Sequence, residues 1–401
     1  MRNALIAVIS VMILSCARTV NTDWLSRSYS DIEKAAHGSV VHFYMWGGSV
    51  SINAWIDGFV SQELKSYYGI TLIRVPMDTR LIVNKLLTEK QAGEKIGTID
   101  LIWINGENFR NAFENGLLFG PFTEKLPNFT NYIDPGSAEY DFGYPVKGFE
   151  APWGRAQFVF EYDSARIKNP PRSFRDLINW VKAHPGRFTY PQPPDFTGSA
   201  FIRQAFYALT GGYSQYMKGY DVALLKNRSV LLWKYLNSIK PYLWQNGKIF
   251  PRDIASLDGL FERGEVDFNM SYHQADAANR IITGRYPETV RTFVMKDGSV
   301  YNTHFTAIAF NSPNKAGAMV LANFLMSPQA QYSKNMPANW GDFTVLDLKR
   351  LPEEWKIKFR ELDLGKSTLP IDELVKYGVP EIPSGYVEAL EDGWKNEVLS
   401  K

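Results

Sequence analysis

The sequence predicts an α/β protein of two lobes, with a parallel sheet in the first lobe that helices cover on both faces. From Val40 onward strands and helices alternate, and the first strands are apolar along nearly their whole length. Both features are typical of parallel strands buried between helices. The roughly 385 residues that follow the leader exceed the about 250–300 residues at which a single core usually stops growing. We therefore expect two lobes.

The first 15 residues read as a signal peptide. Met1-Arg2-Asn3 supplies one positive charge, and residues 4–14 are apolar except for Ser10. A basic head, an apolar run of about 7–15 residues and a small residue before the cut mark a secretion leader, whereas a spanning helix needs roughly 20 apolar residues. No later run approaches that length. We expect an exported chain, periplasmic or at the cell surface, that does not cross a membrane.

Cys16 is the predicted start of the mature protein. Ile13-Leu14-Ser15-Cys16 resembles a bacterial lipobox, in which the thiol is acylated and the peptide is cleaved just before it. Because Cys16 is the only cysteine in 401 residues, it cannot form an internal disulfide, and a free thiol is a liability outside the cell. Residues 16–38 are then a lipidated terminus and polar tether. The alternative is an ordinary signal peptide with an incidental cysteine.

The elements of the first lobe follow from apolar runs and helical periodicity. A helix is expected where Trp55, Phe59, Leu64 and Tyr67 recur near the 3.6-residue period. Glycines at 69, 93 and 116 end the predicted helices. The predicted strands cover residues 40–46, 70–75 and 98–105, and the further helices cover 81–92 and the segment through Phe109 and Phe113.

A second unit follows residue 156. Its predicted strands cover residues 157–162, 187–191, 266–272, 290–295 and 303–310, and its helices cover 174–182, 198–209, 231–243, 274–282, 315–326, 328–334 and 385–399. The Lys296-Asp297-Gly298-Ser299 turn predicts that the strands on either side of it form a hairpin.

Charge and motifs argue against several function classes. The chain has 44 basic and 42 acidic residues and no basic tract, so we expect no nucleic-acid partner. It contains no phosphate loop, HExxH pair or nucleophile elbow, and its five histidines lack zinc-ligand spacing. We therefore predict no catalytic residues, no metal and no cofactor. A large exported α/β chain of this kind is expected to be a binding protein.

Two loops at the ends of first-lobe strands are candidate ligand contacts. In the first, glycines allow close approach of the backbone, and the following helix start offers free N–H groups. In the second, a tryptophan beside two asparagines could stack on a ring and hydrogen-bond its edge. A plain tight turn and a core tryptophan are the alternatives. The candidates are Trp46, Gly47, Gly48, Trp103, Asn105 and Asn108.

Two loops of the second lobe are also candidate ligand contacts. In residues 193–199 two prolines precede a helix start that Thr197 or Ser199 is expected to cap, which is a second site for an anion, although capping alone also explains it. The other loop brings a phenol and an imidazole to the end of the 266–272 strand. Ligands of open α/β sheets lie beyond the carboxyl ends of strands, where all four loops fall. The candidates are Phe196, Thr197, Ser199, Tyr272 and His273.

Three runs, residues 97–109, 151–158 and 193–201, resemble the family 1 extracellular solute-binding proteins of ABC importers, in their YnjB-like branch. The resemblance spans about residues 40–399 and implies a type II periplasmic-binding-protein-like fold, hinged by crossover strands around a central ligand cleft. It places crossings near 156–158, 303–307 and 337–340, with Trp153 and Trp340 near the ligand. One lobe then comprises 39–156 and 307–338, and the other 157–306 and 339–401.

The resemblance further implies a monomer that captures a small polar solute and delivers it to a membrane permease with its ATPase. A thiamine-like or phosphorylated compound is favoured over a sugar, polyamine, metal ion or oxyanion. A polyamine ranks lower because the four loops contain only two carboxylates, Glu107 and Asp195, and ferric ion ranks low because only Tyr272 is well placed. The alternatives are an exported hydrolase with an unrecognised Asp/Glu site and a surface adhesin lipoprotein.

Overall fold

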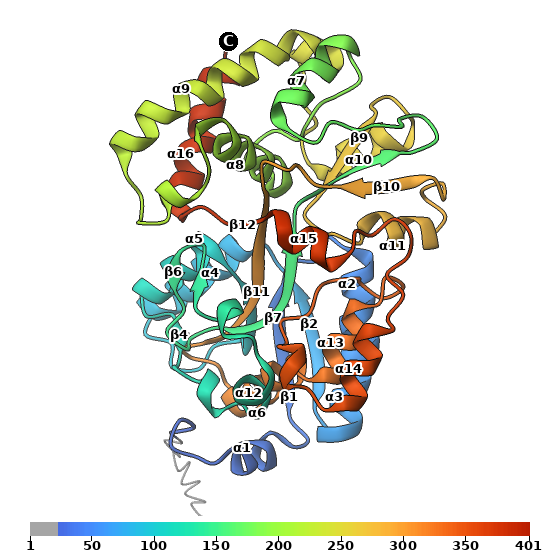
Figure 1. The fold of residues 1–401 in the computed structure, drawn as a ribbon. Coiled ribbons are helices and arrows are strands. Elements are labelled where there is room, and N and C mark those ends of the chain that lie inside the picture. The colour runs from blue at the N-terminus through green and yellow to red at the C-terminus, as the bar shows by residue number, and fades with distance from the viewer. Residues whose placement is uncertain (1–22) are drawn as a thin grey trace, which may run out of the picture.

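The chain folds into two lobes joined by strands that run between them (Figure 1). The computed structural model describes residues 23–401, so the predicted signal peptide and the lipidation of Cys16 lie outside the described residues. Within that described part, none of the helices combines the length and the apolar character that crossing a bilayer requires.

The first lobe is built on a parallel sheet, as predicted. Strand β1 (Val40–Met45) lies between β2 (Thr71–Pro76) and β3 (Leu101–Ile104) and pairs in parallel with both. Successive side chains alternate between the faces: Phe43 belongs to one apolar cluster and Tyr44 to another. Both faces are therefore covered.

Helices from both ends of the chain cover this sheet. The first helix packs against α12, almost 300 residues later, and shares an apolar cluster with it. On the other face, α4 and α5 cover Tyr44 and Ile102. The helices of this lobe are α1 (Tyr29–Ala36), α2 (Val50–Trp55), α3 (Ser61–Tyr68), α4 (Thr79–Gln91), α5 (Gly106–Glu114), α6 (Pro127–Tyr132), α12 (Lys315–Leu325), α13 (Pro328–Asn335) and α14 (Glu353–Arg360), with a π-helical turn, Ile56–Val60, between α2 and α3.

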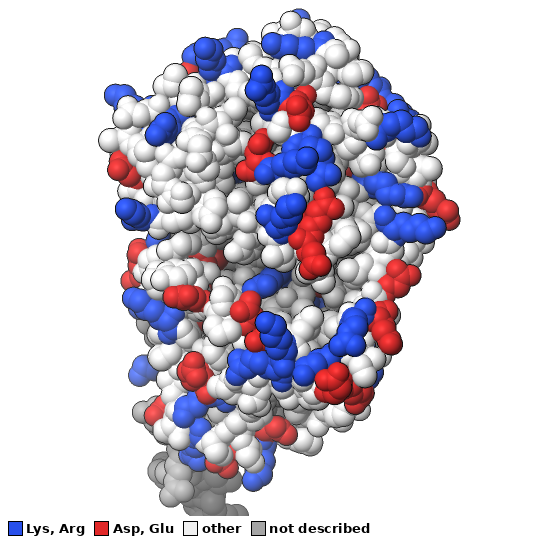
Figure 2. All heavy atoms as spheres, viewed as in Figure 1, with Lys and Arg blue, Asp and Glu red and all other residues white. Residues whose placement is uncertain are grey.

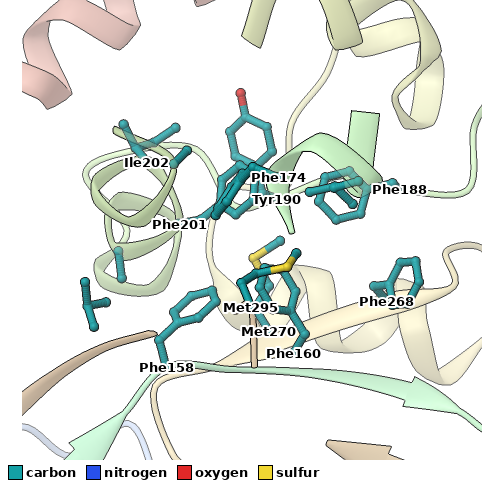
Figure 3. Close-up of a cluster of buried hydrophobic side chains, with 14 of the residues drawn as sticks. Phe158, Phe160, Phe174, Phe188, Tyr190, Phe201, Ile202, Phe268, Met270 and Met295 are labelled. Carbon is teal, nitrogen blue, oxygen red and sulfur yellow. The ribbon is translucent and has the colours of Figure 1, made fainter. Parts of the chain in front are cut away.

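The second lobe contains an antiparallel sheet of three strands in the order β10–β8–β9. They are β8 (Val159–Asp163), β9 (Phe268–Ser271) and β10 (Val290–Phe293). Figure 3 shows Phe201 of α8 in the same apolar cluster as Phe160 and Met270 of the sheet. The helices of this lobe are α7 (Phe174–Ala183), α8 (Phe196–Thr210), α9 (Val222–Ile239), α10 (Ile254–Glu262), α11 (Asp276–Ile282), α15 (Ile371–Tyr377) and α16 (Ser384–Trp394).

Two long strands connect the lobes. β7 (Ala151–Gln157) is antiparallel to β11 (Ser299–Ala309), and β11 continues to pair with β3 in the first lobe. At its other end β11 pairs with the short strand β12 (Gly378–Pro380). Both β7 and β11 lie where the sequence places crossings, which supports their assignment as the hinge.

The division of the chain between lobes remains a prediction, and packing favours one change to it. Residues after 338 were assigned to the second lobe. However, Trp340, Val345 and Leu351 are buried in the apolar cluster of the first lobe. After Val300, the next residue buried in the second-lobe cluster is Ile382. We therefore favour assigning about residues 340–360 to the first lobe.

Two predicted elements are wrong. The turn at residues 296–299 forms, since the Gly298 N–H donates to the Met295 carbonyl, but its flanking strands do not pair. Instead β10 pairs with β8, whereas β11 leaves for the hinge. No strand forms at residues 187–191; Phe188 and Tyr190 are buried there, and the Phe188 carbonyl accepts from Trp244 N–H. Local sequence specified an extended apolar segment in both cases, but not its partner.

Candidate functional site

A short hairpin of the first lobe reaches the second lobe. Strands β5 (Tyr140–Asp141) and β6 (Tyr144–Pro145) are joined by Phe142 and Gly143. The Phe142 ring centre lies 6.0 Å from the guanidinium carbon of Arg203 in α8. A side chain at Gly143 would meet Pro383, just before α16, within 3.2 Å. The hairpin tip therefore lies between the lobes.

Beneath this tip the first lobe buries two carboxylates. Asp141 accepts a hydrogen bond from the Gly106 N–H at the start of α5, and burial raises the pKa of Asp141 well above its usual range. Glu150, directly before β7, is fully buried, and neither of its carboxylate oxygens has a hydrogen-bond partner among the described residues. Burial, and secondarily the charge of Asp141, raises the pKa of Glu150 well above its usual range.

The second lobe contributes a buried ion pair. The Arg203 guanidinium donates to both oxygens of Glu381, each at 2.7 Å, through Nε and Nη2. The Tyr272 hydroxyl donates to the same carboxylate at 2.6 Å. The Glu381 charge also acts on Asp141, which shows that the buried carboxylates of the two lobes approach one another.

Charged side chains also meet at the rim between α5 and α16. Arg110 lies 3.7 Å from Glu388, and Arg80 lies 3.6 Å from Glu107. Burial, and then the proximity of Glu388, raises the pKa of Glu107. Figure 2 shows Lys and Arg interspersed with Asp and Glu over the visible face of both lobes.

The first-lobe candidates occupy the predicted ends of strands. Trp46 follows β1 with 47% of its surface exposed, and its ring covers Gly48, where a Cβ would meet it at 2.2 Å. Gly47 lies against Pro76, so a side chain there would clash as well. Asn105 precedes α5 without a side-chain capping bond, and Asn108 is half-buried in that helix.

In the second lobe one predicted role is wrong. Asp195, not Thr197 or Ser199, caps α8 by accepting from the Gly198 N–H at 2.8 Å. Thr197 and Ser199 are buried, and Ser199 donates to Glu391 at 2.6 Å. The helix begins at Phe196, so Thr197 and Ser199 lie inside its first turn and Asp195 occupies the capping position.

The aromatic candidates of this lobe lie together. Phe196 is 45% exposed, and its ring centre is 4.9 Å from that of Tyr272. The His273 Nδ1 lies 3.9 Å from the Asp276 carboxylate of α11, so the imidazole faces the next helix as expected. The Tyr272 hydroxyl instead points to Glu381.

Trp153 of the connecting strand β7 and Trp340 are packed in the apolar cluster of the first lobe rather than on a surface. Both are buried, and their rings are 5.2 Å apart. Trp103 is half-buried between them and His304, at 5.0 Å from Trp153 and 5.1 Å from His304. In this conformation a solute could contact Trp103 but not the two buried tryptophans behind it.

Sequence reasoning missed the carboxylates and the arginine. The four candidate loops at the strand ends do not contain these residues, and only the fold brings them together. They are Asp141, Glu150, Arg203 and Glu381. A charged residue directly before a buried strand, as Glu150 is, was the one available signal. Within residues 23–401, no group of three or more histidine, cysteine, aspartate or glutamate side chains is arranged to hold a metal ion.

A sequence profile describing bacterial extracellular solute-binding proteins matches residues 60–345. The chain is also 37% identical to Protein YnjB of Escherichia coli (strain K12) over 390 residues, which is 96% of this chain and 97% of that one. The chain belongs to the bacterial extracellular solute-binding family. Its predicted family and YnjB-like branch are therefore confirmed.

Several solved structures share the fold at low sequence identity. The spermidine/putrescine substrate-binding protein PotD of Streptococcus pneumoniae superposes with a TM-score of 0.62 at 16% identity, over 90% of this chain and 99% of that one. The periplasmic binding protein AfuA of Actinobacillus pleuropneumoniae, with fructose-6-phosphate bound, gives 0.59 at 16%, over 90% and 98%. Both support the type II fold.

Proposed function

We propose that this protein captures a small polar solute between its lobes and delivers it to the permease of an ABC importer. The observation that carries the proposal is the buried polar site to which both lobes contribute: Asp141 and Glu150 from one, Arg203 and Glu381 from the other. β7 and β11 lie behind it as the connecting strands. A site divided in this way exists only when the lobes are together.

Closure then acts as the signal to the permease. A solute that contacts both lobes favours the closed state by its differential affinity for that state alone. The contacts Phe142–Arg203 and Arg110–Glu388 form only when the lobes meet, so they help to define the closed surface. A membrane permease with its ATPase reads that surface, and the chain itself catalyses no reaction.

The solute contacts that we propose combine the exposed aromatic side chains with the buried polar groups. Each lobe provides one exposed aromatic ring: Trp46 follows β1 in the first lobe, and Phe196 begins α8 in the second. Solved structures of similar fold are described as binding spermidine or putrescine, thiamin and fructose-6-phosphate, so the fold alone leaves the solute class open.

We also propose that the chain is exported as a monomer and tethered through acylated Cys16, with residues 17–38 as the connection. A receptor that hands solute to a permease benefits from being held beside it. One acyl chain binds a membrane only marginally, so stable tethering takes at least two. Mass spectrometry of the membrane fraction tests this: the Cys16→Ser variant should lose both the lipid and the membrane association.

Thermal-shift screening of the mature chain tests the binding function. A ligand that binds only the native state adds RT ln(1 + [L]/Kd) to its stability, so the melting temperature should rise with the logarithm of solute concentration. The screen should include amines, thiamine, sugars, phosphorylated sugars and oxyanions. A chain that none of these classes stabilises contradicts the proposal.

A further inference from the structure

We infer that the solute is an organic cation, whose positively charged nitrogen lies between Glu150, Asp141 and the ring of Phe142. This inference rests on the proposed function and names the solute class of that same site. Three features support it: the balance of buried charge, the unpartnered oxygens of Glu150 and the side chains that occupy the helix starts.

Buried charge in the interlobe region is unbalanced toward the acidic side. Three buried carboxylates, Asp141, Glu150 and Glu381, stand against one buried cation, Arg203. Because Arg203 donates to both oxygens of Glu381, its charge is already matched. Asp141 and Glu150 are left without a paired cation among the described residues, and the charge of Asp141 acts on Glu150.

Glu150 also lacks hydrogen-bond donors. Its carboxylate is fully buried and both oxygens are unpartnered among the described residues, while Asp141 accepts from the Gly106 N–H. A buried polar group is normally satisfied, and a buried charge is normally paired. An ammonium group supplies up to three donors and one positive charge, which are the two things that this carboxylate lacks.

Aromatic rings at the same place are already arranged around a cation. The Arg203 guanidinium carbon lies 6.0 Å from the ring centre of Phe142 and 5.7 Å from that of Phe196. Aromatic faces attract cations at about this distance. Phe142 comes from the first lobe and Phe196 from the second, so a solute cation enters between two ring-bearing walls.

Among residues 23–401, an anionic solute finds no comparable partners at this site. Its natural partners would be helix starts and free arginines. Asp141 occupies the start of α5 and Asp195 the start of α8, and Ser49 accepts from the Ile52 N–H at the start of α2. The anionic group that the sequence placed at the helix starts is therefore replaced by the protein's own side chains, which disfavours a phosphorylated solute.

Binding of a cation should release protons. Because burial raises the pKa of both Asp141 and Glu150, these carboxyl groups of the empty site keep their protons to a higher pH than an exposed carboxyl group does. An arriving ammonium favours their ionised forms and expels those protons. Affinity for the amine should therefore increase with pH, within the range where the amine itself stays charged.

Isothermal titration tests the inference with putrescine, spermidine and thiamine, against glucose, fructose-6-phosphate and inorganic phosphate. We expect saturable binding of at least one of the three cations, with a heat that changes with the ionisation enthalpy of the buffer because protons are released. Glu150→Gln should lower that affinity by about 10- to 100-fold, the usual loss when a hydrogen bond to a charged group is removed.

Two further variants make the result specific. Glu139→Gln removes an exposed carboxylate beside the same hairpin and should leave the affinity unchanged. Asp141→Asn keeps an acceptor for the Gly106 N–H while removing the charge, and should weaken binding even if Glu150→Gln fails to fold. Binding of glucose or a phosphate compound without any cation overturns this inference but leaves the proposed function intact. Failure of every compound weakens both.

Discussion

Replacing one partner of a buried ion pair near the hinge should strongly destabilise this protein. Lys334 and Asp342 are both fully buried, with Nζ 2.6 Å from Oδ2, and the Lys334 ammonium also donates to the Phe343 carbonyl. Gly154 leaves space for the Asp342 carboxylate, because a Cβ at residue 154 would lie 2.0 Å from it. Replacing Asp342 by Asn keeps the shape and leaves the ammonium without its counter-charge.

The expected loss can be worked out by two routes. Breaking a buried pair by removing one partner costs about 3–5 kcal/mol. The lysine could instead lose its proton, which costs an ordinary lysine about 4–5 kcal/mol at pH 7. Burial already lowers the pKa of Lys334, so for this lysine the cost is smaller. Asp342→Asn should therefore lower the free energy of unfolding by at most about 3–5 kcal/mol.

Urea unfolding followed by tryptophan fluorescence measures this loss, since Trp340 lies beside the pair. The matched control is the double variant Lys334→Met/Asp342→Leu, which removes both charges and should be nearly as stable as the wild type. A single variant within about 1 kcal/mol of the wild type, or a double variant as unstable as the single one, contradicts the reasoning.

The Lys334–Asp342 ion pair also makes the stability of the protein depend on pH. Although burial alone favours the neutral acid, the Lys334 ammonium and His304 hold the pKa of Asp342 below its usual range. A depressed pKa in the folded state stabilises the protein above the unfolded value of about 3.9, and this stabilisation is lost as the pH falls through the folded pKa. The wild type and Asp342→Asn should therefore converge in stability only in strong acid.

Three further predictions concern other residues. Burial, followed by the Asp276 charge, raises the pKa of Glu161 to about 8, so stability should fall as the pH rises from about 4 to 8, and Glu161→Gln should remove that fall in a melting-temperature series. Asp195→Ala should cost about 1 kcal/mol in urea unfolding by uncapping α8, while Asp195→Asn keeps most of the stability. Trp46→Ala should weaken solute affinity in titration while changing stability by less than about 0.5 kcal/mol, because the ring is half exposed; unchanged affinity would remove Trp46 from the site.

Local sequence was sufficient for most elements and for the ends of the first-lobe strands. Apolar runs and helical periodicity placed β1, β2, β3, α4 and α5 within a few residues of their observed bounds. Local sequence was not sufficient to predict which strands pair. The 296–299 turn looks like a hairpin because a turn residue pattern is local, whereas the partner of β11 is decided by strands more than a hundred residues away.

The site shows the same division between local and distant information. Trp46, Phe196 and Tyr272 are candidates from the sequence because strand ends and loop glycines are visible there, and their role as ligand contacts stays a prediction. Glu150 and Glu381 could not, since a lone glutamate near an apolar strand looks like any surface charge. Only the packing of the hairpin tip onto α8 shows that these charges are buried together. Asp195 lay beside the predicted caps, but choosing among neighbouring capping residues requires the exact first turn of the helix.

The contact between α1 and α12 bears on the order of events during synthesis. The first lobe buries its earliest helix against one that begins at Lys315, so its core cannot close until more than three quarters of the chain is available. Contacts of such sequence separation form slowly and late. We expect a ribosome-bound or partly emerged chain to stay open, which suits a polypeptide that is to be threaded across a membrane before it folds.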